Sequence, residues 1–216
     1  MIQTIKGCPL FKGISDAQLQ SLFDCLSAKK EAYKKDDFIF RVDDRAVLVG
    51  VVISGGANVI QEDFWGNRTI LTHIDPGELF GESFSCAETE RLPVSVIATE
   101  ASEIMFMDYR KIVTVCSSAC VFHSQLISNM LRILADKNIL LTRKMEFISK
   151  RTTREKLLSF LSAQAMQTKK NKVIIPFNRQ ELADFLCVER SALSREMSLM
   201  KKDGLLDYEK NRFTLI

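Results

Sequence analysis

Four polar residues near the C-terminus have the types and the spacing needed to read DNA bases. They are Arg190, Ser191, Ser194 and Arg195. One arginine guanidinium can donate two hydrogen bonds to O6 and N7 of guanine, and a serine hydroxyl can donate to a base or to a phosphate oxygen. If the segment is a helix that enters a major groove, its first turns present these four side chains to base edges and phosphates.

A second polar group precedes this segment, and its pattern predicts where a helix begins. Asn178 is followed three residues later by Glu181, which is the form of a capping box. Arg179 and Gln180 then lie in the first turn of that helix. We expect both to contact DNA, with Arg179 placed for the sugar-phosphate backbone.

The segments around these residues form a predicted helix-turn-helix. Residues 187–189 read as a tight turn between a helix that starts after Asn178 and a second helix over Arg190–Met200. Cys187 stands in that turn, where a positive φ would strain a residue other than glycine. Residues 204–216 read as a closing hairpin or wing. The predicted buried faces of the two helices consist of Leu182, Ala183, Leu186, Leu193, Met197 and Met200.

The charge distribution agrees with this reading. The net charge of the 216 residues is only +3, but residues 150–216 hold 14 basic and 8 acidic side chains, a balance of +6. With 46% hydrophobic and 26% charged residues, the chain has the composition of one or two globular domains. No window is apolar enough for a membrane span and no signal peptide is visible, so we expect a cytoplasmic protein with mostly reduced cysteines.

The first half of the chain predicts a small β-structure. Short strands are expected at Val47–Ile53, Ala57–Gln61, Thr69–His73 and Val94–Ala98, separated by glycine-bearing turns, and this spacing is typical of a β-barrel or jelly roll. A helix with Ser15 as its N-cap and Gln18 three residues later is expected before it.

A long helix is predicted between these two regions, because Ser118–Ser149 contains no helix breaker. Apolar residues recur in it at steps of four and three, with one asparagine among them, which predicts a homodimer seam. The alternative is that this stripe packs only on its own barrel. The seam consists of Ile127, Leu131, Leu134, Asn138, Leu141, Met145 and Ile148.

Taken together, three features resemble the CRP/FNR family of bacterial transcription regulators. They are the stretch Gly77–Glu82, the long seam helix and the segment from Asn178 to Arg195. The resemblance implies an α+β fold with a cyclic-nucleotide-binding-like β jelly roll over residues 1–112, a dimerisation helix over 113–149 and a winged helix-turn-helix over 150–216. It also implies double-stranded DNA with an inverted-repeat site as partner, and RNA polymerase if the protein is an activator.

The residues that bind cyclic AMP in some members of the family differ in this chain. Members that bind cyclic AMP carry an Arg-Ser or Arg-Thr pair where this chain has Leu92-Pro93, and Arg91 is one residue out of place. A phosphodiester buried without a paired cation is costly. We therefore expect a different small-molecule effector, such as an organic acid or an aromatic compound, between barrel and long helix. The candidate effector residues are Gly81, Glu82, Leu92, Asn138 and Leu141.

Other cofactors of the family are not expected. Cys8 and Cys25 are too far apart in the sequence for the closely spaced cysteines of its iron-sulfur members, and His73 reads as an ordinary strand residue rather than a haem ligand. Cys116 and Cys120, one helical turn apart, form a possible thiol sensor or half of a metal site, but packing is the simpler interpretation.

These observations favour an effector-responsive, homodimeric DNA-binding regulator over an enzyme, because no catalytic motif is present. The alternative is a ligand-binding or thiol-redox signalling module that acts through protein contact.

Overall fold

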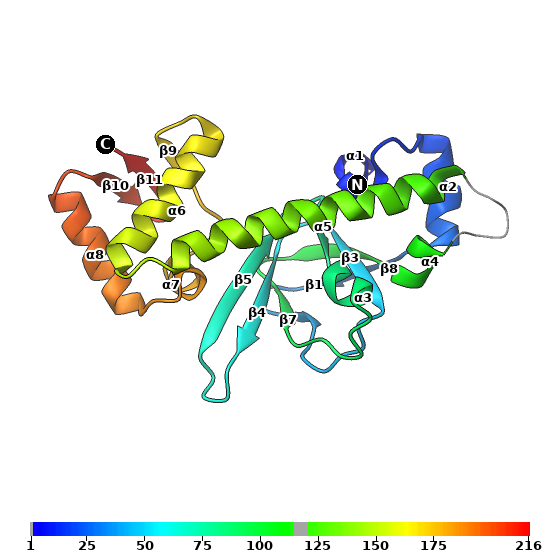
Figure 1. Cartoon of the computed structure of the whole chain (residues 1–216), viewed down its shortest axis with the longest axis horizontal. Coiled ribbons are helices and arrows are strands. Elements are labelled where there is room, and N and C mark those ends of the chain that lie inside the picture. The colour runs from blue at the N-terminus through cyan, green and yellow to red at the C-terminus, as the bar shows by residue number, and fades with distance from the viewer. Residues whose placement is uncertain (1, 115–120) are drawn as a thin grey trace. The chain divides into compact units, whose positions relative to one another are not determined.

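The structure is a computed structural model that describes residues 2–114 and 121–216 (Figure 1). The chain folds as two compact units. The first contains the chain up to Lys137 apart from Gly66–Ile70, and the second contains those five residues and Asn138–Ile216. The boundaries after residues 112 and 149, which separate the predicted jelly roll, dimerisation helix and winged helix-turn-helix, stay predictions. Within the described residues, no helix combines the length and the apolar character needed to cross a bilayer.

The first unit begins with three short helices, α1 (Ile2–Gly7), the 3-10 helix η1 (Pro9–Phe11) and α2 (Asp16–Cys25). The predicted start of α2 is confirmed, because Gln18 Oε1 accepts a hydrogen bond from the Ser15 backbone N–H at 3.0 Å. This closes the capping box that the sequence indicates.

Two four-stranded sheets follow and make the jelly roll (Figure 1). The four predicted strands are confirmed as β3 (Leu48–Ser54), β4 (Ala57–Glu62), β5 (Arg68–Ile74) and β7 (Ser95–Ala98). Four more strands complete the sheets, in the orders β1-β8-β3-β6 and β2-β7-β4-β5. These are β1 (Lys29–Tyr33), β2 (Phe38–Phe40), β6 (Leu79–Phe80) and β8 (Ser102–Asp108).

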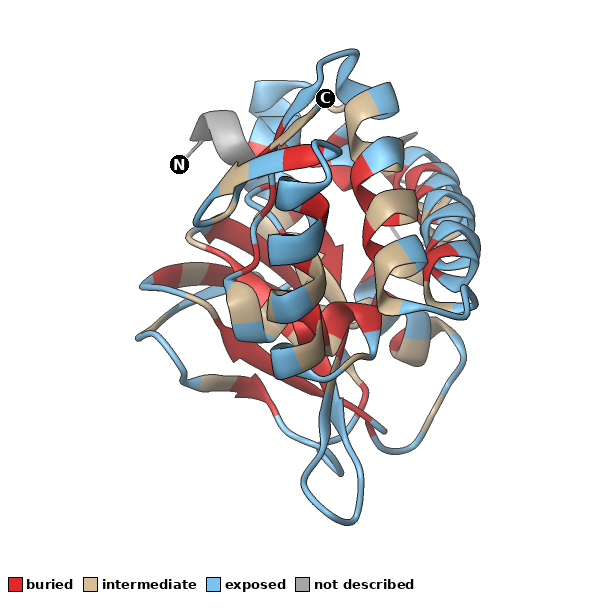
Figure 2. Cartoon of the chain, turned by 90° about the vertical axis from the view of Figure 1, so that its left-hand side faces the viewer, coloured by how far each residue is buried: buried red, intermediate tan, exposed pale blue. Residues whose placement is uncertain are grey.

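An aromatic cluster fills the jelly-roll core. The Phe40 ring centroid lies 5.5 Å from those of both Phe80 and Phe106. A Cβ atom at Gly50 would lie 2.2 Å from the Phe80 ring, so the approach of this ring to β3 requires glycine. Figure 2 shows buried residues on the strands and exposed residues on the loops that join them.

The first unit also contains the short helices α3 (Glu82–Cys86) and α4 (Tyr109–Val113) and the first half of the long α5 (Val121–Ile148). This half of α5 packs through Leu126, Met130 and Ile133, all buried in one hydrophobic cluster with residues of β3 and β8. Their spacing of four and three is that of one helix face.

The second unit is a winged helix-turn-helix, as predicted. Its elements are α6 (Thr153–Thr168), β9 (Lys172–Ile174), α7 (Arg179–Leu186), α8 (Arg190–Lys202), β10 (Leu206–Glu209) and β11 (Arg212–Leu215). The last two strands form an antiparallel hairpin that pairs with β9. A chain of aromatic contacts joins the helices, with ring centroids 4.7–5.8 Å apart, through Phe147, Phe160, Phe185 and Phe177.

Candidate nucleic-acid interface and effector region

Helix α7 begins where the capping box predicts. The Asn178 side-chain oxygen accepts hydrogen bonds from the backbone N–H groups of Gln180 and Glu181, at 2.9 and 3.1 Å. The Glu181 carboxylate accepts the Asn178 backbone N–H at 2.7 Å. Local sequence alone therefore determines the first turn of the motif.

The turn between α7 and α8 is strained, as predicted. Cys187 caps α7 in the left-handed conformation, with φ 53° and ψ 57°. The Lys156 ammonium donates to the backbone carbonyls of Leu186 at 3.3 Å and Cys187 at 3.2 Å. A cation at this helix C-terminus satisfies carbonyls that have no partner within the helix. The sequence reasoning missed this role of Lys156.

Helix α8 separates a buried face from an exposed one. Leu193, Met197 and Met200 are fully buried, as predicted. Arg190, Ser191 and Arg195 are exposed and Ser194 is half-buried. In the described part of the chain, neither arginine makes an ion pair. Their guanidinium groups are therefore available to bases or phosphates.

The two predicted contacts at the start of α7 have different surroundings. Gln180 is exposed, and its side chain donates to Asp184 at 2.8 Å. Arg179 is half-buried: its guanidinium contacts the Met197 sulfur and lies 5.1 Å from the centre of the Tyr208 ring. Burial lowers the pKa of Arg179. A phosphate contact by Arg179 therefore competes with packing against the wing.

Arg154 on α6 holds the far end of α8 in place. Its Nε lies 3.1 Å from the Glu196 carboxylate, and its Nη2 lies 2.9 Å from the Asp203 carboxylate. These ion pairs raise the pKa of Arg154. In the structure a capping box from Thr152 to Glu155 sets the start of α6, whereas the contact of Arg154 across the fold has no local signal in the sequence.

The predicted seam of α5 lies largely outside the packed face. Leu131, Leu141 and Met145 have exposed fractions of 64%, 56% and 66%, and Asn138 is exposed. Ile127, Leu134 and Ile148 are half-buried. The jelly roll packs mainly against the other stripe of α5 described above, and of the seam residues Leu134 also packs against that hydrophobic cluster. Whether the seam joins two copies of the chain stays a prediction.

The candidate effector residues have tertiary partners that the sequence did not indicate. Glu82 is buried directly after Gly81, and its carboxylate lies 2.8 Å from the Lys137 ammonium. Leu92 is a buried member of the aromatic core cluster. Arg91 donates to the Asp43 carbonyl at 2.8 Å. The other two candidates, Asn138 and Leu141, belong to the second unit and are exposed.

An open pocket of about 350 Å³ lies beside α3 and α4. It is lined by nine residues, among them Arg45, Ser85, Tyr109 and Arg110. None of the predicted effector residues lines it, so the sequence did not indicate this pocket.

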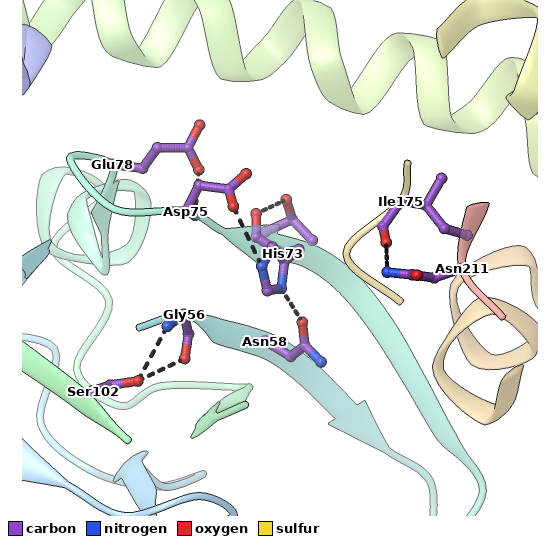
Figure 3. A network of polar contacts seen from close by, with 9 residues as sticks. Gly56, Asn58, His73, Asp75, Glu78, Ser102, Ile175 and Asn211 are labelled. Carbon is purple, nitrogen blue, oxygen red and sulfur yellow. Dashed lines mark hydrogen bonds and ion pairs between the residues drawn. The ribbon is translucent and has the colours of Figure 1, made fainter. Parts of the chain in front are cut away.

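His73, the barrel histidine considered above as a haem ligand, has protein groups beside both of its ring nitrogens. Its Nδ1 lies 2.7 Å from the Asn58 side-chain oxygen and its Nε2 lies 3.6 Å from the Asp75 carboxylate (Figure 3). This contact lowers the pKa of Asp75. Both ring nitrogens thus face protein groups at the end of β5.

Two thiols of the first unit, Cys8 and Cys86, are poor candidates for redox sensing. Burial raises the pKa of Cys8 to about 11, and burial also raises the pKa of Cys86. Because the thiolate is the reactive form, both remain protonated and unreactive near neutral pH. Cys116 and Cys120, the candidate thiol pair, lie outside the described residues.

A jelly roll followed by a long helix and a winged helix-turn-helix defines a class of DNA-binding proteins that carry an effector domain. Comparisons with known proteins agree. Residues 30–119 match the model of the cyclic nucleotide-binding domain, and residues 155–216 match that of the Crp-like helix-turn-helix domain. The chain belongs to the CRP/FNR family of DNA-binding transcription regulators, as the sequence indicated.

The individual relatives have low sequence identity to this chain. The chain is 26% identical over 183 residues to the transcriptional activator protein FnrA of Stutzerimonas stutzeri, covering 82% of this chain and 72% of that protein. Its fold is similar to that of the c-di-GMP-responsive regulator CLP of Xanthomonas campestris (TM-score 0.76, 20% identity, 93% and 99% of the two chains). It is also similar to a CooA mutant from Carboxydothermus hydrogenoformans (TM-score 0.73, 23% identity, 89% and 85%).

Proposed function

We propose that the protein works in the cytoplasm as a homodimer that binds an inverted-repeat DNA site and responds to a small effector other than cyclic AMP. The exposed seam of α5 carries the proposal. Leu131, Leu141 and Met145 leave apolar surface open along one helix stripe, and a second copy of the same stripe covers it in a symmetric pair.

Such a dimer carries two copies of α8. A two-fold axis along the seam places them about 34 Å apart, in successive major grooves, so the operator is an inverted repeat with half-site centres one helical turn apart. Arg190, Ser191, Ser194 and Arg195 read each half-site, while Arg179 and Gln180 contact its backbone. RNA polymerase is a further partner if the protein is an activator.

The proposal of another effector rests on the missing cation. A phosphodiester in the jelly roll needs a charge partner. Leu92 is part of the apolar core, the Arg91 guanidinium donates to the Asp43 carbonyl, and the Glu82 carboxylate pairs with Lys137. We infer a small organic acid or aromatic compound, which shifts the population of DNA-competent dimers because it binds them more tightly than the other form.

The dimer is tested by placing charge in the seam. The double substitution Leu141→Lys with Met145→Lys should convert the protein from twice 24.5 kDa to a monomer in native mass spectrometry, and it should abolish operator binding. Thr142→Lys, which adds one lysine charge at an exposed position off the seam, is the control. A monomeric wild type, or a double variant that remains dimeric, contradicts the proposal.

A milder substitution tests the register of the seam. Asn138→Leu should leave a folded protein whose register or oligomeric state is altered, since a polar residue in a seam specifies both. Unchanged dimer mass and unchanged operator affinity would contradict the assignment of Asn138.

DNA recognition and the effector require separate assays. Selection from a random DNA library should recover an inverted repeat, and affinity for it should fall steeply with salt. Cyclic AMP should leave that affinity unchanged. A cyclic AMP response, or a selection that recovers no common sequence, would count against the corresponding part of the proposal.

A further inference from the structure

The corner between β6 and α3 buries a carboxylate. Gly81 has φ +83°, and a Cβ atom there would lie 2.9 Å from the Leu48 carbonyl oxygen, so the turn depends on glycine. It directs the next residue, Glu82, into the protein, where the side chain is only 2% exposed. A buried carboxylate needs a charge partner or hydrogen bonds to remain ionised.

One lysine of α5 supplies the charge. The Lys137 ammonium lies 2.8 Å from Glu82 Oε1 and also donates to the Leu79 carbonyl. The Ser83 hydroxyl donates to the same carboxylate oxygen at 2.9 Å. Glu82 Oε2 has no hydrogen-bond partner among the residues that the structure describes. Lys137 therefore supplies the charge partner of Glu82.

Lys137 extends the face of α5 that packs on the jelly roll. It follows Ile133 by four residues, one helical turn beyond the apolar stripe of Leu126, Met130 and Ile133. The stripe fixes the helix through non-directional apolar contacts, whereas the ion pair fixes the rotation of this turn at two points, β6 and α3.

The next residues along the helix belong to the exposed seam. Asn138 is adjacent to Lys137, and Leu141 follows one turn later. Because the rotation of a continuous helix is transmitted along its axis, the contact that sets Lys137 also sets the direction in which these two side chains point.

We propose that Lys137 is a positioning residue whose ion pair with Glu82 latches α5 to the jelly roll and holds the dimer seam in its DNA-competent register. The inference rests on the proposed dimeric function, since the seam carries the effect to DNA. It also connects two candidate effector residues, Gly81 and Glu82, to the helix that they must influence.

The test uses the full-length protein in four versions: Lys137→Met, Glu82→Gln, both together, and the control Arg132→Met. The control removes a positive charge from an exposed position of the same helix. Three properties are measured: thermal unfolding, hydrogen exchange along α3 and α5, and affinity for the DNA duplex selected by the wild type, at a temperature where every version is folded.

Removing only one partner leaves a buried charge or an unpaired ammonium, whereas removing both charges together is often tolerated. We expect Lys137→Met to weaken operator binding by about tenfold, a typical strength for coupling between sites. It should also speed exchange in α3 and in residues 133–141. The double variant should recover to within about threefold of the wild type, and Arg132→Met should match the wild type.

The proposal is overturned if Lys137→Met lowers the unfolding temperature but leaves operator affinity and hydrogen exchange beyond residue 137 unchanged. A merely structural ion pair would behave in this way. Failure of the proposed function is distinguishable. If the wild type binds no selected DNA, hydrogen exchange beyond residue 137 in the same four versions still decides whether the ion pair sets the seam.

Discussion

Helix α8 and the Gly81–Glu82 corner place charged side chains in opposite circumstances. Arg190 and Arg195 are exposed and make no ion pair within the described chain, so their charge is free for a partner. Glu82 and Lys137 lie against each other, and the carboxylate is almost completely buried. The first arrangement suits binding a polyanion from solution, while the second suits holding two elements together.

The largest expected effect comes from the buried side of α8. Leu193 is fully buried, so Leu193→Ala should lower the free energy of unfolding by about 2–5 kcal/mol through lost burial and a cavity. Chemical denaturation measures this change. Ser191→Ala on the exposed side should leave stability within about 0.5 kcal/mol. Equal losses of stability in both variants would contradict the division of α8 into a packed face and a binding face.

The exposed side of α8 should show the reverse pattern. Arg190→Ala and Arg195→Ala should each cost about 1–3 kcal/mol in operator binding and relax base preference at one position per half-site, with no change in unfolding temperature. Anisotropy titrations against single-base operator variants measure this. An equal loss of affinity for every DNA sequence would show that the substituted arginine contacts only phosphates.

A buried lysine of the second unit should make stability depend on pH. Burial lowers the pKa of Lys144 from 10.5 to about 8, while its ammonium donates to the Ile70 carbonyl and lies 4.3 Å from the centre of the Phe185 ring. Between pH 8 and pH 10.5 the unfolded chain binds more protons at this site, so the free energy of unfolding rises with pH.

The gain is on the order of 1–2 kcal/mol, less than the full shift, because the carbonyl and the ring favour the charged form. The measurement is the difference between wild-type and Lys144→Met stability across this range, since other alkaline groups cancel in it. If the difference in free energy of unfolding does not change with pH, the folded protein stabilises the charged and the neutral forms of Lys144 equally.

The smallest expected effect concerns the turn before α8. Cys187 has φ 53°, a conformation that glycine adopts without strain, so Cys187→Gly should stabilise the protein by about 0.5–1 kcal/mol. Cys187→Ala keeps the strain and removes only the thiol, and it should give no such gain. Thermal unfolding compares the two, and an equal gain from alanine would assign the effect to the thiol instead.

Local patterns were sufficient for much of the fold. The capping boxes at Ser15 and Asn178, the turn at Cys187 and four of the jelly-roll strands all follow from neighbouring residues, and all are confirmed. Strands β1, β2, β6 and β8 were missed. Two of them, β2 and β6, are only three and two residues long, and β1 is charged and almost wholly exposed, so none of these three shows the alternation that marks a strand.

The candidate DNA-reading residues were identified from sequence because helix periodicity alone separates a buried face from an exposed one. Contacts between residues that are far apart in the sequence have no such local pattern. The Arg179 packing on Tyr208, the Arg154 clamp on α8 and the Lys137–Glu82 pair each join residues 29 to 55 positions apart in the sequence.

The sequence by itself determined the order of the three main regions, the DNA-binding helix pair and the family, since these depend on spacing and capping within short windows. Only the tertiary structure decided which stripe of α5 is packed and which is open, and whether the charges of the effector region are free or paired. The reason is physical: burial and ion pairing depend on distances between segments that the chain brings together only when it folds.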